Sequence, residues 1–251
     1  MVLTVEWRNG NTALPNHDLM LIAFPGVGNV GKAAIDAVNS VNKATQVARL
    51  YDTSLPPLAC LDEDGLLVPP HYSLSSIEST TGKTVLTLTG TTQPVDPNSQ
   101  GLLANEIMQF FMKQGVEELV VMAGLGSEPS RKETFVVASN ASHRIELESK
   151  GVDVRRDEPS SGAIGLTALL ASSGPLYEID SCLAIATTVG ASGDVMASQR
   201  LLDKIDNWFD LGISLPSDTS ANLLAKLRSM APEKAQDVIA ELTDSADAFY
   251  N

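Results

Sequence analysis

The sequence predicts an α/β fold in which a mixed or mostly parallel sheet is flanked by helices. Short apolar runs that are typical of buried strands alternate with longer segments whose apolar residues have helical spacing. The alternation extends over residues 1–212, which form the predicted core domain, and it favours strands joined by helices. Strand signals end there, so residues 213–251 are predicted to form a helical C-terminal extension.

Each predicted element rests on its own local signal. The first strand is an apolar run that ends at Pro25-Gly26, and two helices end at Gly115 and Gly151. The predicted strands are residues 18–24, 46–51, 84–89, 119–123, 135–138 and 183–186. The predicted helices are residues 30–41, 102–114, 142–150 and 164–171, a helix from the capping residue Asp194 to Phe209, and two helices in the extension, 221–230 and 232–248. The proline-rich stretch between residues 52 and 83 is predicted to be irregular.

Composition limits the partners and the location. The net charge of -14 disfavours nucleic acids and anionic membranes, which carry the same sign of charge. Cys60 and Cys182 both lie in apolar stretches and are predicted to be buried free thiols, as in a reducing compartment. Neither a signal peptide nor a membrane-spanning run is recognised, so a cytoplasmic location is expected. The three histidines lack metal-ligand spacing, and neither a metal nor a cofactor is predicted.

A glycine-rich loop joins the first strand to the first helix. Its sequence, Phe-Pro-Gly-Val-Gly-Asn-Val-Gly-Lys over residues 24–32, satisfies both the GxGxxG dinucleotide pattern and the GxxxxGK phosphate-loop pattern. In both patterns, glycines let the backbone approach an anion, and the helix start offers free N–H groups. The candidate anion-binding residues are Gly26, Gly28, Asn29, Gly31 and Lys32.

The partner chemistry of both patterns is incomplete. Ala33 stands where a phosphate loop needs a hydroxyl for magnesium, and the strand 119–123 ends at Gly124 instead of an aspartate. Asp52, at the end of the second predicted strand, keeps the dinucleotide hypothesis open. The structural alternative is a tight turn that packs the first helix against the sheet. No nucleophile is paired with a base, so a non-enzymatic protein is predicted, with a small-molecule or nucleotide-binding enzyme as the alternative.

Four segments together resemble the proteasome assembly chaperone 2 family. Residues 21–32 are similar to its opening signature, and Thr89-Gly90-Thr91-Thr92-Gln93-Pro94 resembles its second motif, although an acidic residue is common at the position of Thr91. The glycine turn after the strand 119–123 and residues 161–165 (Ser-Gly-Ala-Ile-Gly) resemble the third and fourth, so that the resemblance spans residues 18–210. It implies a fold similar to the nucleoside phosphorylase/hydrolase type, a homo-oligomer, and assembly or binding of the proteasome core particle.

The chain ends in Phe249-Tyr250-Asn251, which fits the hydrophobic–Tyr–any-residue tail by which proteasome activators and assembly factors dock. With four tyrosines in 251 residues and 43% hydrophobic residues, a chance match has a probability of about 0.7%. The alternative is a helix that ends in aromatic residues and packs on its own domain. Together with the family resemblance, the tail predicts a cytoplasmic, proteasome-binding assembly chaperone that contacts the α-ring of the core particle.

Overall fold

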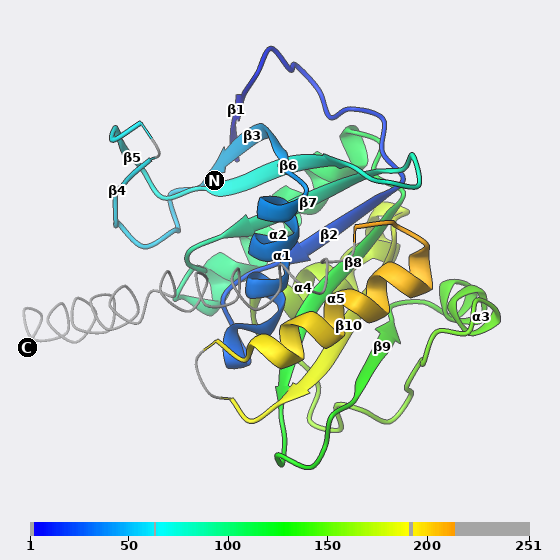
Figure 1. Cartoon of the computed structure of the whole chain (residues 1–251). Helices are drawn as coiled ribbons and strands as arrows, with labels where there is room; N and C mark the ends of the chain where they lie inside the picture. The colour runs from blue at the N-terminus through cyan, green and yellow to red at the C-terminus, as the bar shows by residue number, and fades with distance from the viewer. Residues whose placement is uncertain (1–2, 63, 191–192, 214–251) are drawn as a thin grey trace, which may run out of the picture.

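The computed structural model describes residues 3–62, 64–190 and 193–213 (Figure 1). In these residues the largest sheet has the strand order β1-β3-β6-β7-β2-β8-β10-β9. Its strands are β1 (Thr4–Trp7), β2 (Leu19–Ala23), β3 (Thr45–Tyr51), β6 (Tyr72–Glu78), β7 (Thr84–Gly90), β8 (Glu118–Gly126), β9 (Thr134–Ala138) and β10 (Asp180–Thr188). The helices are α1 (Val30–Val41), α2 (Pro97–Lys113), α3 (Ala141–Ser149), α4 (Gly165–Ser173) and α5 (Val195–Phe209), with short 3-10 turns at η1 (Val27–Asn29) and η2 (Gly174–Tyr177).

The four central strands, β7, β2, β8 and β10, are parallel to one another, and the outer strands pair antiparallel. The predicted mixed sheet flanked by helices is therefore confirmed. Because the central strands run in one direction, the segments that follow them emerge on the same side of the molecule. We call this side the carboxyl edge.

Two layers of helices cover the sheet, with α1 and α5 on one face and α2 and α4 on the other (Figure 1). Strand β2 shows why both layers are needed, since all five of its residues are buried. Leu19, Leu21 and Ala23 belong to the core under α1, while Met20 and Ile22 belong to the core under α2. Successive side chains of a strand point to opposite faces, so a continuous apolar run requires a helix on each side.

Helix boundaries follow local capping chemistry. Helix α1 has the predicted bounds, and α5 begins after Asp194, whose carboxylate accepts a hydrogen bond from the Ala197 N–H at 3.0 Å, as predicted. Helix α2 begins earlier than the predicted residue 102. The side chain of Asp96 accepts from the Ser99 N–H at 2.8 Å, and Pro97 occupies the first helical position, where its missing N–H is not needed.

The prediction of irregular structure between residues 52 and 83 is wrong in part. This stretch contains β6 and a small hairpin of β4 (Cys60–Leu61) and β5 (Leu67–Val68), and the N-terminal strand β1 was also not predicted. Cys60 is exposed because it lies on the projecting hairpin, so the prediction of a buried thiol is wrong there, whereas Cys182 is buried as predicted. Ser75 of strand β6 is buried, so a polar residue interrupts the apolar pattern by which the strand could have been predicted.

Some predictions fall on the part of the chain without a structural description. The helical extension 213–251 is one of them, since only Ile213 of this segment is described. In the described residues, the helices lack the length and apolar content that a membrane span needs. These residues also contain no group of three or more His, Cys, Asp or Glu side chains arranged to hold a metal ion.

His143 is the buried histidine of α3. Its Nε2 lies 2.9 Å from a carboxylate oxygen of Glu118, and its Nδ1 lies 3.4 Å from the Ser181 carbonyl oxygen. Burial by itself lowers the pKa of His143, but the hydrogen bond to Glu118 and the charges of Glu118 and Asp180 outweigh it, so its pKa is raised. Because both nitrogens face acceptors, the doubly protonated ring satisfies both.

This geometry predicts that the protein loses stability as the pH rises through the His143 pKa. A group whose pKa is higher in the folded state stabilises the fold fully below its unfolded pKa of about 6.5, and this stabilisation is lost at higher pH. Urea unfolding of the wild type should show a free energy that falls as the pH rises above the unfolded pKa of about 6.5. His143→Gln should lack this component, and equal pH dependence of the two proteins would contradict the assignment.

Candidate functional site at the carboxyl edge

A cavity of about 450 Å³ lies at the carboxyl edge, between the ends of β2, β8 and β10 and the start of α4. All four segments that carry the family resemblance line it. The first contributes Gly26, Val27 and Gly31, the second Gln93, the third Gly124, and the fourth Gly162–Gly165. We call it the carboxyl-edge cavity. Segments that lie far apart in the sequence thus meet around one space.

Two glycines let the loop after β2 lie directly on the backbone of β8. A Cβ atom on Gly31 would lie 2.2 Å from the Met122 carbonyl oxygen, and one on Gly124 would lie 2.2 Å from the Val27 carbonyl oxygen. Both contacts are with backbone, which cannot move aside as a flexible side chain can. The start of α1 and strand β8 therefore form one continuous wall of the cavity.

The middle of the loop is fastened to the end of β10. Gly28 and Asn29 have φ values of 62° and 53°, a left-handed conformation that glycine and asparagine tolerate. A Cβ on Gly28 would lie 2.7 Å from the Thr188 hydroxyl oxygen, and the Gly28 carbonyl accepts from the Asp194 N–H at 3.0 Å. The loop is thus the tight turn that packs α1 against the sheet, the structural alternative raised by the sequence.

The partners expected for an anion do not converge on this loop. Lys32 is buried, and its Nζ donates to an Asp36 carboxylate oxygen at 2.6 Å, so its charge is neutralised within α1. Asp52 follows β3, and two strands, β6 and β7, separate β3 from β2, so this carboxylate does not lie beside the loop as a dinucleotide site requires. An anion at the loop stays a prediction, with no unpaired cation to support it among the described lining residues.

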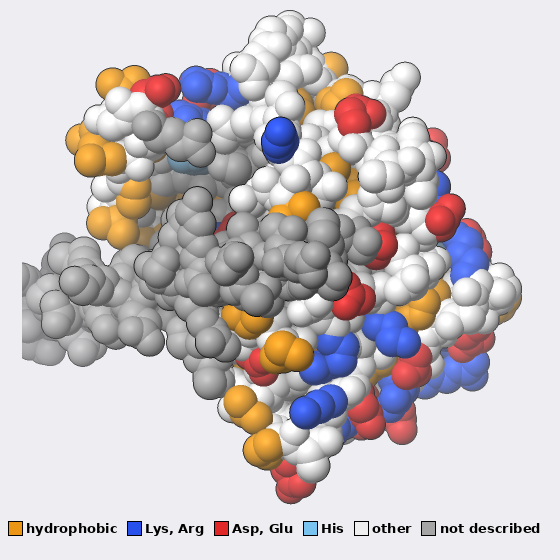
Figure 2. All heavy atoms as spheres, in the orientation of Figure 1, with side chains coloured by type: hydrophobic (Ala, Val, Ile, Leu, Met, Phe, Trp, Pro, Cys, Tyr) orange, Lys and Arg blue, Asp and Glu red, His pale blue; other side chains and the backbone are white. Residues whose placement is uncertain are grey.

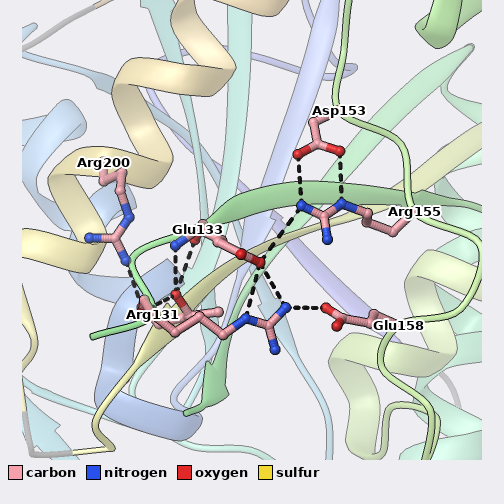
Figure 3. Close-up of polar contacts among 7 residues, drawn as sticks. Arg131, Glu133, Asp153, Arg155, Glu158 and Arg200 are labelled. Carbon is pink, nitrogen blue, oxygen red and sulfur yellow. Dashed lines mark hydrogen bonds and ion pairs between the residues drawn. The ribbon is translucent and has the colours of Figure 1, made fainter. Parts of the chain in front are cut away.

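A loop of residues 159–165 forms the outer wall of the cavity, and a charged network holds the segment before it (Figure 3). Arg131 donates to Glu133 at 2.7 Å and also to Glu158, while Arg155 pairs with Asp153 and Glu133. The hydrogen bonds from Arg155 lower the pKa of Asp153. These side chains are between 28% and 46% exposed, so solvent screens the pairs and each contributes little to stability.

Backbone contacts fix the same segment more firmly. The Val136 N–H donates to the Asp153 carbonyl at 2.8 Å, and the Arg155 N–H donates to the Val136 carbonyl at 2.8 Å, which aligns this segment with the edge strand β9. The network was not predicted from the sequence. The sequence does contain a signal for it, namely residues of opposite charge two positions apart, at Arg131 and Glu133 and at Asp153 and Arg155. Residues with this spacing face the same side of an extended chain and can pair.

The proposed docking residues Phe249, Tyr250 and Asn251 lie outside the described residues. Of the five predicted anion-binding residues, Gly26 and Gly31 line the cavity beside Gln93, Gln100 and residues 162–165, whereas Gly28, Asn29 and Lys32 are not among its lining residues. Gln100, on α2, was not singled out by its sequence context. Only the topology shows that the first turn of α2 reaches the same cavity.

Comparison with known proteins identifies a family. Residues 20–233 match the sequence profile of the PAC2 family. The chain belongs to the PAC2 family. The resemblance to the proteasome assembly chaperone 2 family is thereby confirmed.

Individual relatives are distant in sequence and close in fold. An uncharacterized protein of Methanocaldococcus jannaschii is 23% identical over 186 residues, covering 74% of this chain and 71% of the relative. The crystal structure of Pyrococcus furiosus PbaB, an archaeal proteasome activator, matches with a TM-score of 0.74 and 20% identity over 91% of this chain and 97% of PbaB. PbaA of the same organism, an archaeal homolog of proteasome-assembly chaperone, matches with a TM-score of 0.71 and 17% identity, over 97% of this chain and 99% of PbaA. At such identities the structures show the shared fold.

The packing predicts opposite outcomes for two glycines of the same loop. Gly31→Ala should lower the free energy of unfolding by about 1–3 kcal/mol, because its Cβ would collide with the Met122 carbonyl. Gly26→Ala should change it by less than about 0.5 kcal/mol, because Gly26 is extended and its Cβ would meet nothing closer than 3.9 Å. Urea denaturation measures both, and equal losses for the two variants would contradict the packing role.

Proposed function

We propose that this chain is a proteasome assembly chaperone-like protein that binds the core particle in the cytoplasm. Its contact with the α-ring is made by Phe249, Tyr250 and Asn251, the three residues that end the sequence. The observation that carries the proposal is this hydrophobic–Tyr–any-residue ending on a chain of the PAC2 family. PbaB, described as a proteasome activator, and PbaA, described as a homolog of proteasome-assembly chaperone, support it by their common fold.

The chemistry of the three residues suits capture of a chain end. A terminal carboxylate is an anion that a lysine between two subunits can pair with, and such capture is a known mode of peptide recognition. Phe249 supplies apolar area, and Tyr250 adds a ring whose hydroxyl needs a hydrogen-bond acceptor when it is buried. Asn251 contributes mainly its carboxylate, so its side chain should matter little.

A single tail buries little surface, so useful affinity requires several tails on one oligomer. We propose that the chain forms a closed homo-oligomer, and the β4–β5 hairpin is a candidate contact for a second copy. It projects from the body (Figure 1), and its Leu61, Leu66 and Leu67 are 61–72% exposed. Hydrophobic side chains gather at the upper left of Figure 2, over this hairpin. An ion pair of 3.4 Å between Asp62 and Arg49 ties the hairpin to β3.

The tail proposal predicts that Tyr250→Ala abolishes binding to core particles. The variant keeps the carboxylate but loses the ring and its hydroxyl, whereas Asn251→Ser keeps every group in the proposed contact and should bind like the wild type. Surface-immobilised core particles titrated with each protein measure the difference. Light scattering should give the same mass for all three proteins, a multiple of the 26.6 kDa of one chain.

One outcome would contradict the tail proposal, and another would contradict the proposed homo-oligomer. Undiminished binding of Tyr250→Ala would show that the core particle is contacted elsewhere. A mass near 26.6 kDa at micromolar concentration would show a monomer with a single tail. In either case the fold assignment would stand, because it rests on the family match and on the sheet.

A further inference from the structure

We propose that the carboxyl-edge cavity binds a small, uncharged, mainly apolar molecule that donates a hydrogen bond to Gln93. This inference is independent of docking to the core particle, because it uses none of the residues of the tail. It also differs from the anion predicted for the glycine loop, although the loop forms part of the same wall. Its basis is the size, the position, the polarity and one unpartnered acceptor of the cavity.

The size and the position are those of a ligand site. A volume of about 450 Å³ falls within the range of about 300–1,000 Å³ that small-molecule sites occupy. The cavity opens where the connection after β2 leads to α1 on one face, while α4, which packs on the other face, begins beside it. In open α/β sheets, ligands bind outside the carboxyl ends of the strands where connections diverge in this way.

The lining is neutral. Phe24, Ala123, Leu183 and Ile185 supply apolar surface from the β2, β8 and β10 region, and the glycines add backbone. None of the described lining residues is Asp, Glu, Lys, Arg or His. A phosphate or carboxylate placed here would lose its hydration without gaining a charged side chain as a partner, which is unfavourable. A neutral molecule avoids this cost and gains from contact with the apolar walls.

One polar atom in the wall has no partner. Gln93 Nε2 donates to the Pro25 carbonyl oxygen at 2.6 Å, and a carbonyl oxygen only accepts, so the orientation of the amide is fixed. Its Oε1 then lies buried without a hydrogen bond to any described residue, 3.7 Å from the position that a Cβ of Gly165 would take. Buried acceptors are almost always satisfied in folded proteins. A bound molecule that carries a donor, such as an amide N–H or a hydroxyl, would satisfy it.

The surroundings of Gly165 show that this region is built for a neutral group. The side chain of Gln100 also points its Oε1 there, 3.9 Å from the same Cβ position, while its Nε2 donates to the Pro94 carbonyl at 2.7 Å. Two amide oxygens therefore face the first residue of α4, where a larger residue would fill the space between them. The mouth of the cavity is apolar as well, since Val27 is 48% and Ile164 is 93% exposed.

The test uses the full chain labelled with 15N and a set of matched probes. Acetanilide and indole carry an N–H on an apolar ring, N-methylacetanilide lacks the donor, and benzoate, inorganic phosphate and ATP are anionic. Acetanilide and indole should shift the amide signals of residues 24–31 and 162–168 saturably, with dissociation constants of about 1 mM for molecules of this size. N-methylacetanilide should bind about threefold to tenfold more weakly, because it leaves Gln93 unpaired.

Variants localise the binding. Ala168→Phe should fill the cavity and abolish the shifts, while Ala141→Phe, the same change at an exposed position on α3, should not alter them. Gln93→Met should bind acetanilide and N-methylacetanilide equally, which tests the acceptor even if Ala168→Phe does not fold. The absence of saturable shifts with both donor probes, or equal wild-type affinity for the two anilides, would overturn the proposal. Shifts of the loop with phosphate or ATP would also overturn it and establish the anion instead.

Discussion

The carboxyl edge depends on a close approach between two stretches of backbone. The turn before α1 lies against the end of β8 so tightly that side chains at Gly31 and Gly124 would each overlap a carbonyl oxygen of the other segment. This contact fixes where α1 begins, and it brings the Val27 turn close to the end of β10. There the Gly28 carbonyl accepts a hydrogen bond from the N–H of Asp194, the residue before α5. The cavity exists because these segments meet along one side and the 159–165 loop closes the other.

The same glycines explain why the sequence resembles two nucleotide-binding patterns. A loop in which backbone approaches an anion and a loop in which backbone approaches another strand both exclude side chains, so both require glycine. The difference lies in the partners. Lys32 is used within α1 by Asp36, and the order β3-β6-β7-β2 places Asp52 two strands away from the loop. Whether a motif of this kind can bind a nucleotide depends on the strand order, which the motif itself does not specify.

The sequence predicted the central strands and most helices because their apolar runs and caps are local signals. Strand β6 was not predicted because its buried residues include the polar Ser75. Cys60 was wrongly predicted to be buried because its apolar neighbours lie on a projecting hairpin. The early start of α2 could have been predicted from Asp96-Pro97, which combine a cap with a proline at the first position. The cavity could not, because Gln93, Gly124 and Gly165 meet only through the strand order.

We propose two separate contact regions, a terminal tail for the core particle and a neutral cavity for a small molecule. Hydrogen–deuterium exchange of the full chain, free and with core particles, tests this separation directly. The account predicts slower exchange in peptides that contain residues 245–251 and unchanged exchange in residues 24–31 and 159–165. Protection of the glycine loop without protection of the tail would contradict it, because the carboxyl edge would then be the surface that meets the core particle.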